Sequence, residues 1–255
     1  MHSKIAALIL PVLAVANPLP QSGAAPNPNE IQIVATSYSG SGCPQGSVST
    51  STSPDKTVSL SPKHKSRGII FITPEKVITY GFDQFQTYIG PGTKSADHSK
   101  NCQIHLNLKY PGGFQYAIVD ATYHGWARLD EGVTGQFLTT YFFSQNAGTT
   151  STTKFVAQGG GALTTGQVYT KQDSIETTAT IWSPCGNTGI LNINNRLSLT
   201  SRNPNAYGEL SNDDATVAFT QQLHVAWKAC TPGKGGNSGN GDTIGIGKPS
   251  TEIDV

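Results

Sequence analysis

The fold is decided by residues 102–110, which have the sequence CQIHLNLKY. From Ile104 onward the even positions are apolar or aromatic, and the odd positions between them are polar. A period of two places alternate side chains on opposite faces of an extended chain, so this stretch predicts a half-buried β-strand. The PGG sequence at residues 111–113 predicts a turn, and residues 114–123 predict the returning strand.

The same alternation recurs at residues 191–199 and 217–227, where the inward positions include the polar Asn195 and Gln221. A polar side chain at an inward position predicts a bulge or bend there. No stretch of helix length carries a 3.6-residue apolar stripe. Many short, half-polar strands predict an all-β, antiparallel β-sandwich or jelly-roll-like single domain. The other strands are predicted at residues 31–38, 58–60, 68–73, 77–80, 82–89, 133–143 and 174–182.

The two ends of the chain have compositions unlike the middle. Residues 1–16 combine a basic start, a short apolar run and an Ala-x-Ala ending, which is typical of a cleaved signal peptide. Residues 17–30 are Pro-rich and predict a flexible leader, and the Gly-rich residues 231–255 predict a disordered tail. The β-sandwich domain is therefore expected at residues 31–230. The apolar run is too short to span a bilayer, so we expect a secreted protein, extracellular or cell-wall associated, with no membrane contact after signal cleavage.

Four cysteines follow the predicted cleavage site, and in a secreted chain an even number indicates disulfides. Four cysteines allow three pairings, of which we favour Cys43–Cys102 and Cys185–Cys230 because each joins neighbours in sequence. No two cysteines have the C-x₂-C spacing of a zinc site, so no metal is expected.

Charge and motifs exclude several classes of function. Charged residues make up 13% of the chain and the net charge is +1, so a nucleic-acid partner is not expected. Neither a Gly-x-Ser-x-Gly elbow nor a His-Glu-x-x-His pair occurs, and no cofactor motif is present. The sequence leaves the oligomeric state open.

Several strings, in order along the chain, resemble the secreted fungal and bacterial family classed as domain of unknown function 4360. They are GCPQGS at 42–47, FD at 82–83, GPG at 90–92, KNCQ at 100–103, LNLKYPGGF at 106–114, YHGWARLD at 123–130, GVTG at 132–135, WSPCG at 182–186 and LNIN at 191–194. The resemblance implies a secreted β-rich protein with all four cysteines in family positions. It implies no activity. The Lys-rich segment at 63–67 departs from the family pattern and is interpreted as a local insertion.

Candidate binding residues come from the string at 123–130, namely Tyr123, His124, Trp126 and Asp130. Tyr123 and Trp126, with Tyr141 and Phe142, form an aromatic group around one predicted hairpin. Aromatic faces can stack on sugar rings, but the same side chains can equally fill a core. Candidate carboxylates for glycoside hydrolysis, whose spacing in sequence does not show which converge, are Asp83, Asp120, Asp130, Glu131, Asp173, Glu176 and Glu209.

Three hypotheses about function follow. The favoured one is a non-catalytic module that binds cell-wall or extracellular carbohydrate, with polysaccharide as its partner. The alternatives are a secreted effector-like protein that acts on a protein partner, and a carbohydrate-active hydrolase or lyase. Whether the chain is an enzyme is left open, with the sequence leaning against it.

Overall fold

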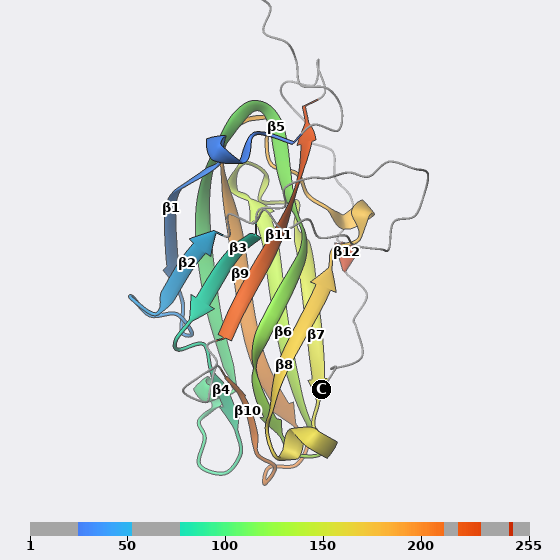
Figure 1. Cartoon of the computed structure of the whole chain (residues 1–255). Coiled ribbons are helices and arrows are strands. Elements are labelled where there is room, and N and C mark those ends of the chain that lie inside the picture. The colour runs from blue at the N-terminus through green and yellow to red at the C-terminus, as the bar shows by residue number, and fades with distance from the viewer. Residues whose placement is uncertain (1–24, 53–76, 212–218, 231–244, 247–255) are drawn as a thin grey trace, which may run out of the picture.

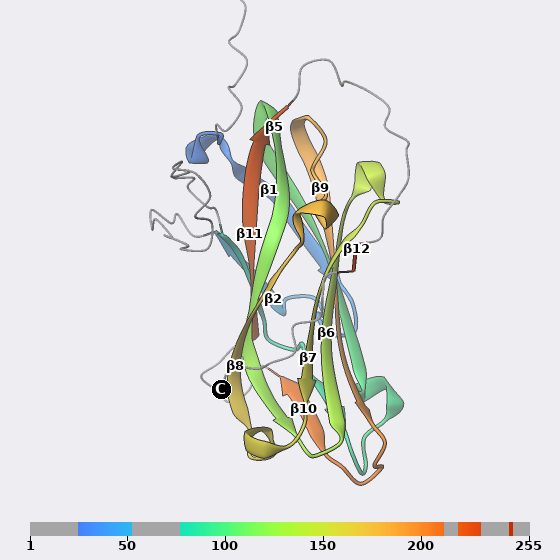
Figure 2. The same cartoon turned by 90° about the vertical axis from the view of Figure 1, so that its right-hand side faces the viewer.

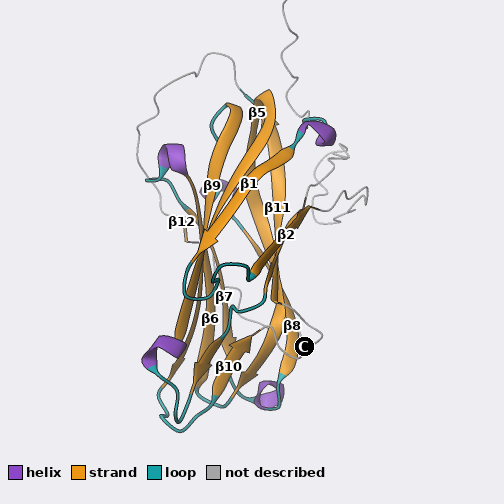
Figure 3. Ribbon diagram, turned by 90° about the vertical axis from the view of Figure 1, so that its left-hand side faces the viewer, coloured by secondary structure: helices purple, strands orange, loops and turns teal. Residues whose placement is uncertain are grey.

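The computed structural model describes residues 25–52, 77–211, 219–230 and 245–246, and its regular structure is almost entirely β-strand (Figure 1, Figure 3). The helical elements of this part are short 3₁₀ turns, none with the length and apolar character that a membrane crossing needs. The strands are β1 (Gln32–Ser39), β2 (Val48–Thr52), β3 (Val77–Phe82), β4 (Thr87–Ile89), β5 (Ser99–Leu129), β6 (Val133–Phe143), β7 (Ser151–Gln158), β8 (Gln167–Ser174), β9 (Gly186–Ser201), β10 (Gly208–Ser211), β11 (Phe219–Ala229) and β12 (Gly245–Ile246). The 3₁₀ turns are η1 (Pro28–Glu30), η2 (Ser95–Asp97), η3 (Ser144–Asn146), η4 (Gly161–Thr164) and η5 (Thr177–Ala179).

The long strand β5 belongs to two sheets at once. Its first half, residues 99–109, pairs with β9 and β1, and with β6, β7 and β12 it forms the layer that we call sheet A. Its second half, residues 114–129, pairs with β11 and β8, and with β3 and β2 it forms sheet B. Near the end of β5, β10 and β4 continue sheet B. Figure 2 shows the two layers from the side. The predicted antiparallel β-sandwich is therefore confirmed.

The two halves of β5 meet at a corner between the sheets. Gly113 has φ +85°, a left-handed conformation that favours glycine, and its carbonyl accepts a hydrogen bond from the Cys230 N–H at 2.7 Å. The halves pair with strands of different sheets rather than with each other, so the predicted turn is an arch over the edge of the sandwich (Figure 1). The connection from β5 to β6 also crosses between the sheets. The single hairpin that the sequence suggested around Tyr123 and Tyr141 is therefore wrong.

A bulge in β5 reverses which side chains face the core. His224 of β11 lies opposite Asp120 and Val225 lies opposite Ile118, so Val119 is an extra residue in β5. Before the bulge the even-numbered side chains are buried, and after it the odd-numbered ones are. The reversal places residues 121, 123, 125, 127 and 129 in the core and residues 122, 124, 126 and 128 on the outer face of sheet B.

Aromatic side chains fill most of the space between the sheets. The largest fully buried ones are Tyr80, Tyr110, Tyr116, Tyr123, Tyr141, Tyr169, Phe82, Phe85, Phe137, Phe155 and Phe219. The polar Asn195 and Gln221 are also fully buried. The predicted bulge at these two positions is wrong, because the register of β9 and β11 is unbroken there. Instead the Asn195 Nδ2 donates to the Gln221 Oε1 at 2.9 Å across the sandwich, which satisfies both amides.

Other strand predictions have mixed outcomes. The strands at 31–38, 77–80 and 133–143 are confirmed with small shifts of their ends. Of the predicted strand at 82–89, only Thr87–Ile89 is a separate strand, β4, because β3 ends at Phe82. The predicted strand at 174–182 is wrong, since β8 ends at Ser174. The predicted strands at 58–60 and 68–73, the signal peptide at 1–16, most of the leader and most of the tail lie outside the described residues. Within the tail, Gly245–Ile246 pairs with β7 as β12.

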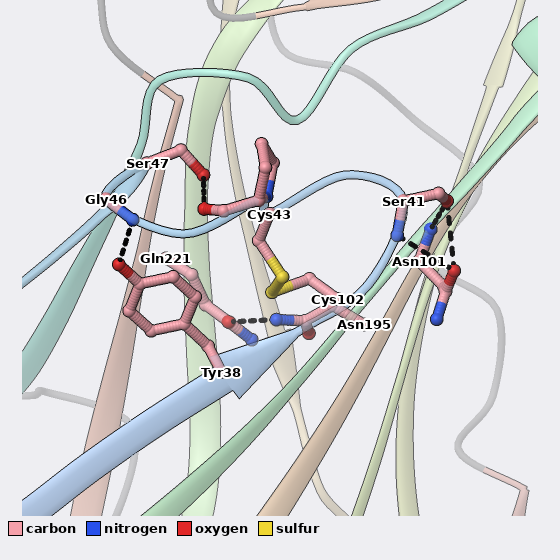
Figure 4. The surroundings of a disulfide bond; sticks show 10 residues. Tyr38, Ser41, Cys43, Gly46, Ser47, Asn101, Cys102, Asn195 and Gln221 are labelled. Carbon is pink, nitrogen blue, oxygen red and sulfur yellow. Dashed lines mark hydrogen bonds between the residues drawn. A yellow bond between two sulfur atoms is a disulfide. The ribbon is translucent and has the colours of Figure 1, made fainter.

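Both predicted disulfides are confirmed. Cys43–Cys102 fastens the loop after β1 to the first half of β5 (Figure 4). Cys185–Cys230 joins the residue before β9 in sheet A to the residue after β11 in sheet B, so it links the two layers.

Candidate functional site

The four predicted binding residues lie on two sides of sheet B. Tyr123 is fully buried, and its hydroxyl lies 2.7 Å from the Thr153 Oγ1 and 3.1 Å from the Thr139 Oγ1. His124 and Trp126 point outward and are partly exposed. The structure therefore brings His124 and Trp126 together and places Tyr123 on the opposite side of the sheet.

The aromatic group suggested by the sequence is divided in the same way. Tyr141 is fully buried beside Tyr123, with the two hydroxyls 3.4 Å apart. Phe142 is partly exposed on the outer face of sheet A, whereas Trp126 is on that of sheet B. Two of these aromatic side chains are core residues, and the other two cannot contribute to one surface.

Trp126 lies among short side chains that leave room for its indole. It is opposite Val168 of β8 on one side and Ser211 of β10 on the other. A Cβ on Gly166 would lie 2.3 Å from the Trp126 Cζ2, so the indole packs directly on this glycine. His124 precedes Trp126 by two residues and lies on the same face, and its Nδ1 is 2.8 Å from the Thr170 Oγ1.

The outer face continues past Trp126 to a group of charged and aromatic residues. Arg128 of β5 lies opposite Glu209 of β10, which in turn lies opposite Tyr88 of β4. The Arg128 guanidinium lies 4.9 Å above the ring of Tyr207, whose hydroxyl donates to the Glu209 Oε2 at 2.8 Å. Burial and the neighbouring Glu209 raise the pKa of Tyr207 to about 12, so its phenol stays protonated as a donor.

Asp130 lies beside these residues and holds Tyr207 in place by two hydrogen bonds. Its Oδ2 accepts the Tyr207 N–H at 2.8 Å, and its own N–H donates to the Tyr207 carbonyl at 2.9 Å. Asp130 thus positions the loop that precedes β10. We call the surface formed by His124, Trp126, Arg128, Val168, Thr170, Tyr207 and Glu209 the Trp126 face. Sequence reasoning missed Tyr207 and left Glu209 among unplaced acids, because no local pattern shows that β10 pairs with β5.

A polar hollow of about 500 Å³ lies on the opposite side of the molecule, on the outer face of sheet A. Its lining comes from three adjacent strands, with Ser99 and Asn101 from β5, Asn194 and Arg196 from β9, and Leu138 and Thr140 from β6. None of these residues was a candidate from the sequence, since outward polar side chains on a strand resemble ordinary solvated ones.

A more enclosed, apolar hollow of about 350 Å³ lies where β1 of sheet A faces β3 and β11 of sheet B. Ile33, Ile78, Leu108 and Trp227 contribute to its lining. Thr52, the last described residue before the gap at 53–76, is also part of its wall. No function is assigned to this hollow.

Two carboxyl groups have raised pKa values, but they do not face a common cleft. Burial raises the pKa of Asp120, which lies on the outer side of sheet B with its Oδ1 3.5 Å from the His224 Nε2. Burial also raises the pKa of Asp173, which points inward and accepts the Lys154 N–H at 2.6 Å. A pair of acids across a substrate, as glycoside hydrolysis needs, is not formed by these two. Among the described residues no three His, Cys, Asp or Glu side chains group as metal ligands would.

Asp173 gives a prediction about stability and pH. Because burial raises its pKa, the folded protein holds this proton more tightly than the unfolded chain does, and stability falls as pH rises above the ordinary aspartate range. Asn in place of Asp173 keeps an acceptor for the Lys154 N–H and does not ionise. We expect Asp173→Asn to raise the melting temperature at pH 7 and to leave it unchanged near pH 3.

The exposed Asp97 is a control of opposite sign. The Lys94 N–H donates to its carboxylate at 3.0 Å and lowers its pKa, so its charge stabilises the fold above the ordinary aspartate range. Asp97→Asn should therefore lower the melting temperature slightly at pH 7. If Asp173→Asn also lowers it at pH 7, the raised pKa of Asp173 is contradicted.

Comparisons with known proteins place the chain in a family. The sequence profile of a family described as "Domain of unknown function (DUF4360)" matches residues 29–230. A protein of Arthroderma benhamiae described as "Uncharacterized secreted protein" is 38% identical over 209 residues, which are 82% of this chain and 76% of that protein. The resemblance found in the sequence and the prediction of a secreted protein are thereby confirmed.

Solved structures with a detectable likeness include two carbohydrate-binding modules. TmCBM61, solved with β-1,4-galactotriose, has a TM-score of 0.24 at 11% identity, covering 76% of this chain and 90% of that one. The family 11 module of Clostridium thermocellum, solved with a β-1,3-1,4-mixed-linked tetrasaccharide, has a TM-score of 0.21 at 8% identity, covering 78% and 90%.

Proposed function

The chain belongs to the family described as a domain of unknown function (DUF4360), and from that premise we propose that it is a secreted, non-catalytic protein that binds cell-wall or extracellular carbohydrate through the Trp126 face. The observation that carries the proposal is the outward, partly exposed indole of Trp126 in the middle of a β-sheet. An exposed tryptophan flanked by polar groups is typical of a recognition surface, because it offers a large apolar face at little cost in side-chain entropy.

The neighbours of Trp126 suit a sugar. Sugar rings have an apolar C–H face, which stacks on an indole, and a rim of hydroxyls that both donate and accept hydrogen bonds. Arg128 supplies donors and Glu209 supplies acceptors on one side of the indole, and His124 and Thr170 supply both on the other. A few polar groups placed around an apolar platform fix the orientation of a ligand.

The test is a pull-down of the mature protein on insoluble chitin, β-glucan, cellulose and mannan, with released sugar assayed in the same tubes. Retention on one polymer without released sugar is the expected result. Trp126→Ala should lower the affinity for that polymer at least about tenfold, because stacking and buried apolar area are lost. Trp182→Ala is the matched control, since Trp182 is also partly exposed but lies away from the Trp126 face. The centroid of its ring is 4.0 Å from the Lys228 Nζ.

Two results would overturn the proposal. If sugar is released, the protein is an enzyme. If Trp126→Ala and Trp182→Ala weaken retention equally, the Trp126 face is not the binding surface. Should Trp126→Ala unfold the domain, Val168→Asp provides the same test, because Val168 is 46% exposed beside Trp126 and its replacement disturbs the surface without touching the core.

A further inference from the structure

The acidic residues of the sandwich are distributed unequally between its two sheets. In the described chain no Asp or Glu occurs within any strand of sheet A, whereas Asp120, Asp173 and Glu209 lie in strands of sheet B. The basic side chains Lys109, Lys154 and Arg196 of sheet A have no acid beside them in its strands. In sheet B, the basic Arg128, Lys171 and Lys228 are matched by the three acids. The outer face of sheet A therefore attracts anions, although the net charge of the whole chain is only +1.

Arg196 lines the polar hollow from β9, the middle one of its three strands. The strand register places it between Asn101 of β5 and Leu138 of β6. Its Nε donates to the Ser99 Oγ at 3.3 Å, which orients the guanidinium in the hollow. No ion pair joins Arg196 to a carboxylate among residues 25–52, 77–211 and 219–230, so its charge is uncompensated there.

Asn101 adds donors rather than acceptors to the hollow. Its Oδ1 already accepts hydrogen bonds from the Ser41 N–H at 3.4 Å and the Ser41 Oγ at 3.0 Å (Figure 4). This leaves the amide N–H₂ of Asn101 for a ligand. A cationic fork beside free amide donors suits an acceptor-only, planar group, and a carboxylate is such a group.

The loop that fixes Asn101 is itself held firmly. The Cys43–Cys102 disulfide anchors it two residues from Ser41, and the Gly42 N–H donates to the Asn101 carbonyl at 2.9 Å. Gly40 lies so close to β5 that a Cβ there would be 2.2 Å from the backbone carbonyl oxygen of Asn101, so only glycine fits at this position. A rim that is already ordered favours binding, because the ligand does not have to offset the entropic cost of ordering the loop.

We infer that the hollow on sheet A is a second binding site, separate from the Trp126 face, and that it takes an acidic polysaccharide segment whose sugars bear carboxylates. Arg196 binds the carboxylate, and Asn101 donates to its oxygens or to the ring hydroxyls. Asn194 and Thr140 meet further hydroxyls, and Leu138 contacts the C–H face of the sugar.

The experiment measures binding of the full mature chain to polygalacturonate and to the same polymer with its carboxyls methyl-esterified. Binding to the acid form and at least about tenfold weaker binding to the ester are expected, since hydrogen bonds to charged groups are the stronger ones. Arg196→Gln should weaken binding to the acid form about ten- to hundredfold and leave binding to the ester unchanged. Lys109→Gln, on the same face but outside the hollow, controls for general charge and should have much less effect.

Three results would overturn this inference. They are equal binding of the acid and the ester, equal loss with Arg196→Gln and Lys109→Gln, and binding to dextran sulfate as strong as to polygalacturonate, which would show that any anion suffices. Trp126→Ala should leave polygalacturonate binding intact, and Arg196→Gln should leave retention on the neutral polymer intact. Failure of the second site is thereby distinguishable from failure of the Trp126 face.

Discussion

A double variant that replaces Cys43 and Cys102 by alanine is expected to lower the free energy of unfolding by about 4 kcal/mol, on the chain-entropy account of a disulfide. The crosslink joins residues separated by 59 positions, and both cysteines are buried, so its loss frees a long loop of the unfolded chain without exposing a polar group. Urea unfolding of the double variant beside the native protein, followed by tryptophan fluorescence, measures the difference.

The second disulfide provides the control for this prediction. Cys185–Cys230 closes a segment of similar length, 45 positions, so its removal should destabilise the fold by a similar amount, about 4 kcal/mol. The variants should differ in binding, because Cys43–Cys102 anchors the loop that holds Asn101 and Cys185–Cys230 does not. We expect weaker binding to polygalacturonate from the Cys43/Cys102 variant alone. Equal loss of binding in both would show that the hollow depends on overall stability and not on this loop.

The sequence predicts the fold well where one signal decides it. The alternation at residues 102–110 and 133–143 is the direct imprint of strands with one buried face, and both strands are present in sheet A. Strands rich in Ser and Thr were missed, notably β2 and β7, because such stretches also suit loops. Pairing between distant strands, such as β10 with β5, has no local signal at all.

The candidate site was harder to predict because one extra residue in β5, Val119, reverses which of the following side chains face the core. Without the bulge at Val119, the alternation that buries Tyr116 and Ile118 would bury Trp126 and expose Tyr123. A one-residue shift moves every later side chain to the other face of a sheet. Sequence alternation shows which residues share a face, but where the bulge lies depends on the pairing with β11. The polar hollow was unpredictable for a related reason, since its residues come from three strands that are distant in sequence.

The buried polar side chains between the sheets form one directed chain of hydrogen bonds. The Thr139 hydroxyl donates to the Asn195 Oδ1 at 2.8 Å, so its single hydrogen is used and Tyr123 must be the donor in the 3.1 Å contact with Thr139. Because the single hydrogen of the Tyr123 hydroxyl is then used as well, the Thr153 hydroxyl must donate to the Tyr123 oxygen at 2.7 Å. The Asn195 Nδ2 then donates to the Gln221 Oε1, which links sheet A to sheet B, and the Gln221 Nε2 donates back to the Thr139 and Tyr141 hydroxyls at 3.5 Å.

We expect Asn195→Leu to lower the free energy of unfolding by about 3 kcal/mol, because in the core the Thr139 hydroxyl hydrogen loses its acceptor and the Gln221 Oε1 loses its donor. Gln221→Leu leaves the Asn195 Nδ2 without its acceptor and should cost about 2 kcal/mol. The double variant should cost no more than about 3 kcal/mol, since the Gln221 oxygen and the Asn195 amide that each single variant leaves unsatisfied are then both absent. Urea unfolding of the four proteins with both disulfides intact gives this cycle. A double variant whose cost equals the sum of the singles would show that the two amides act independently, and the network would then be a set of separate contacts rather than the link between the sheets.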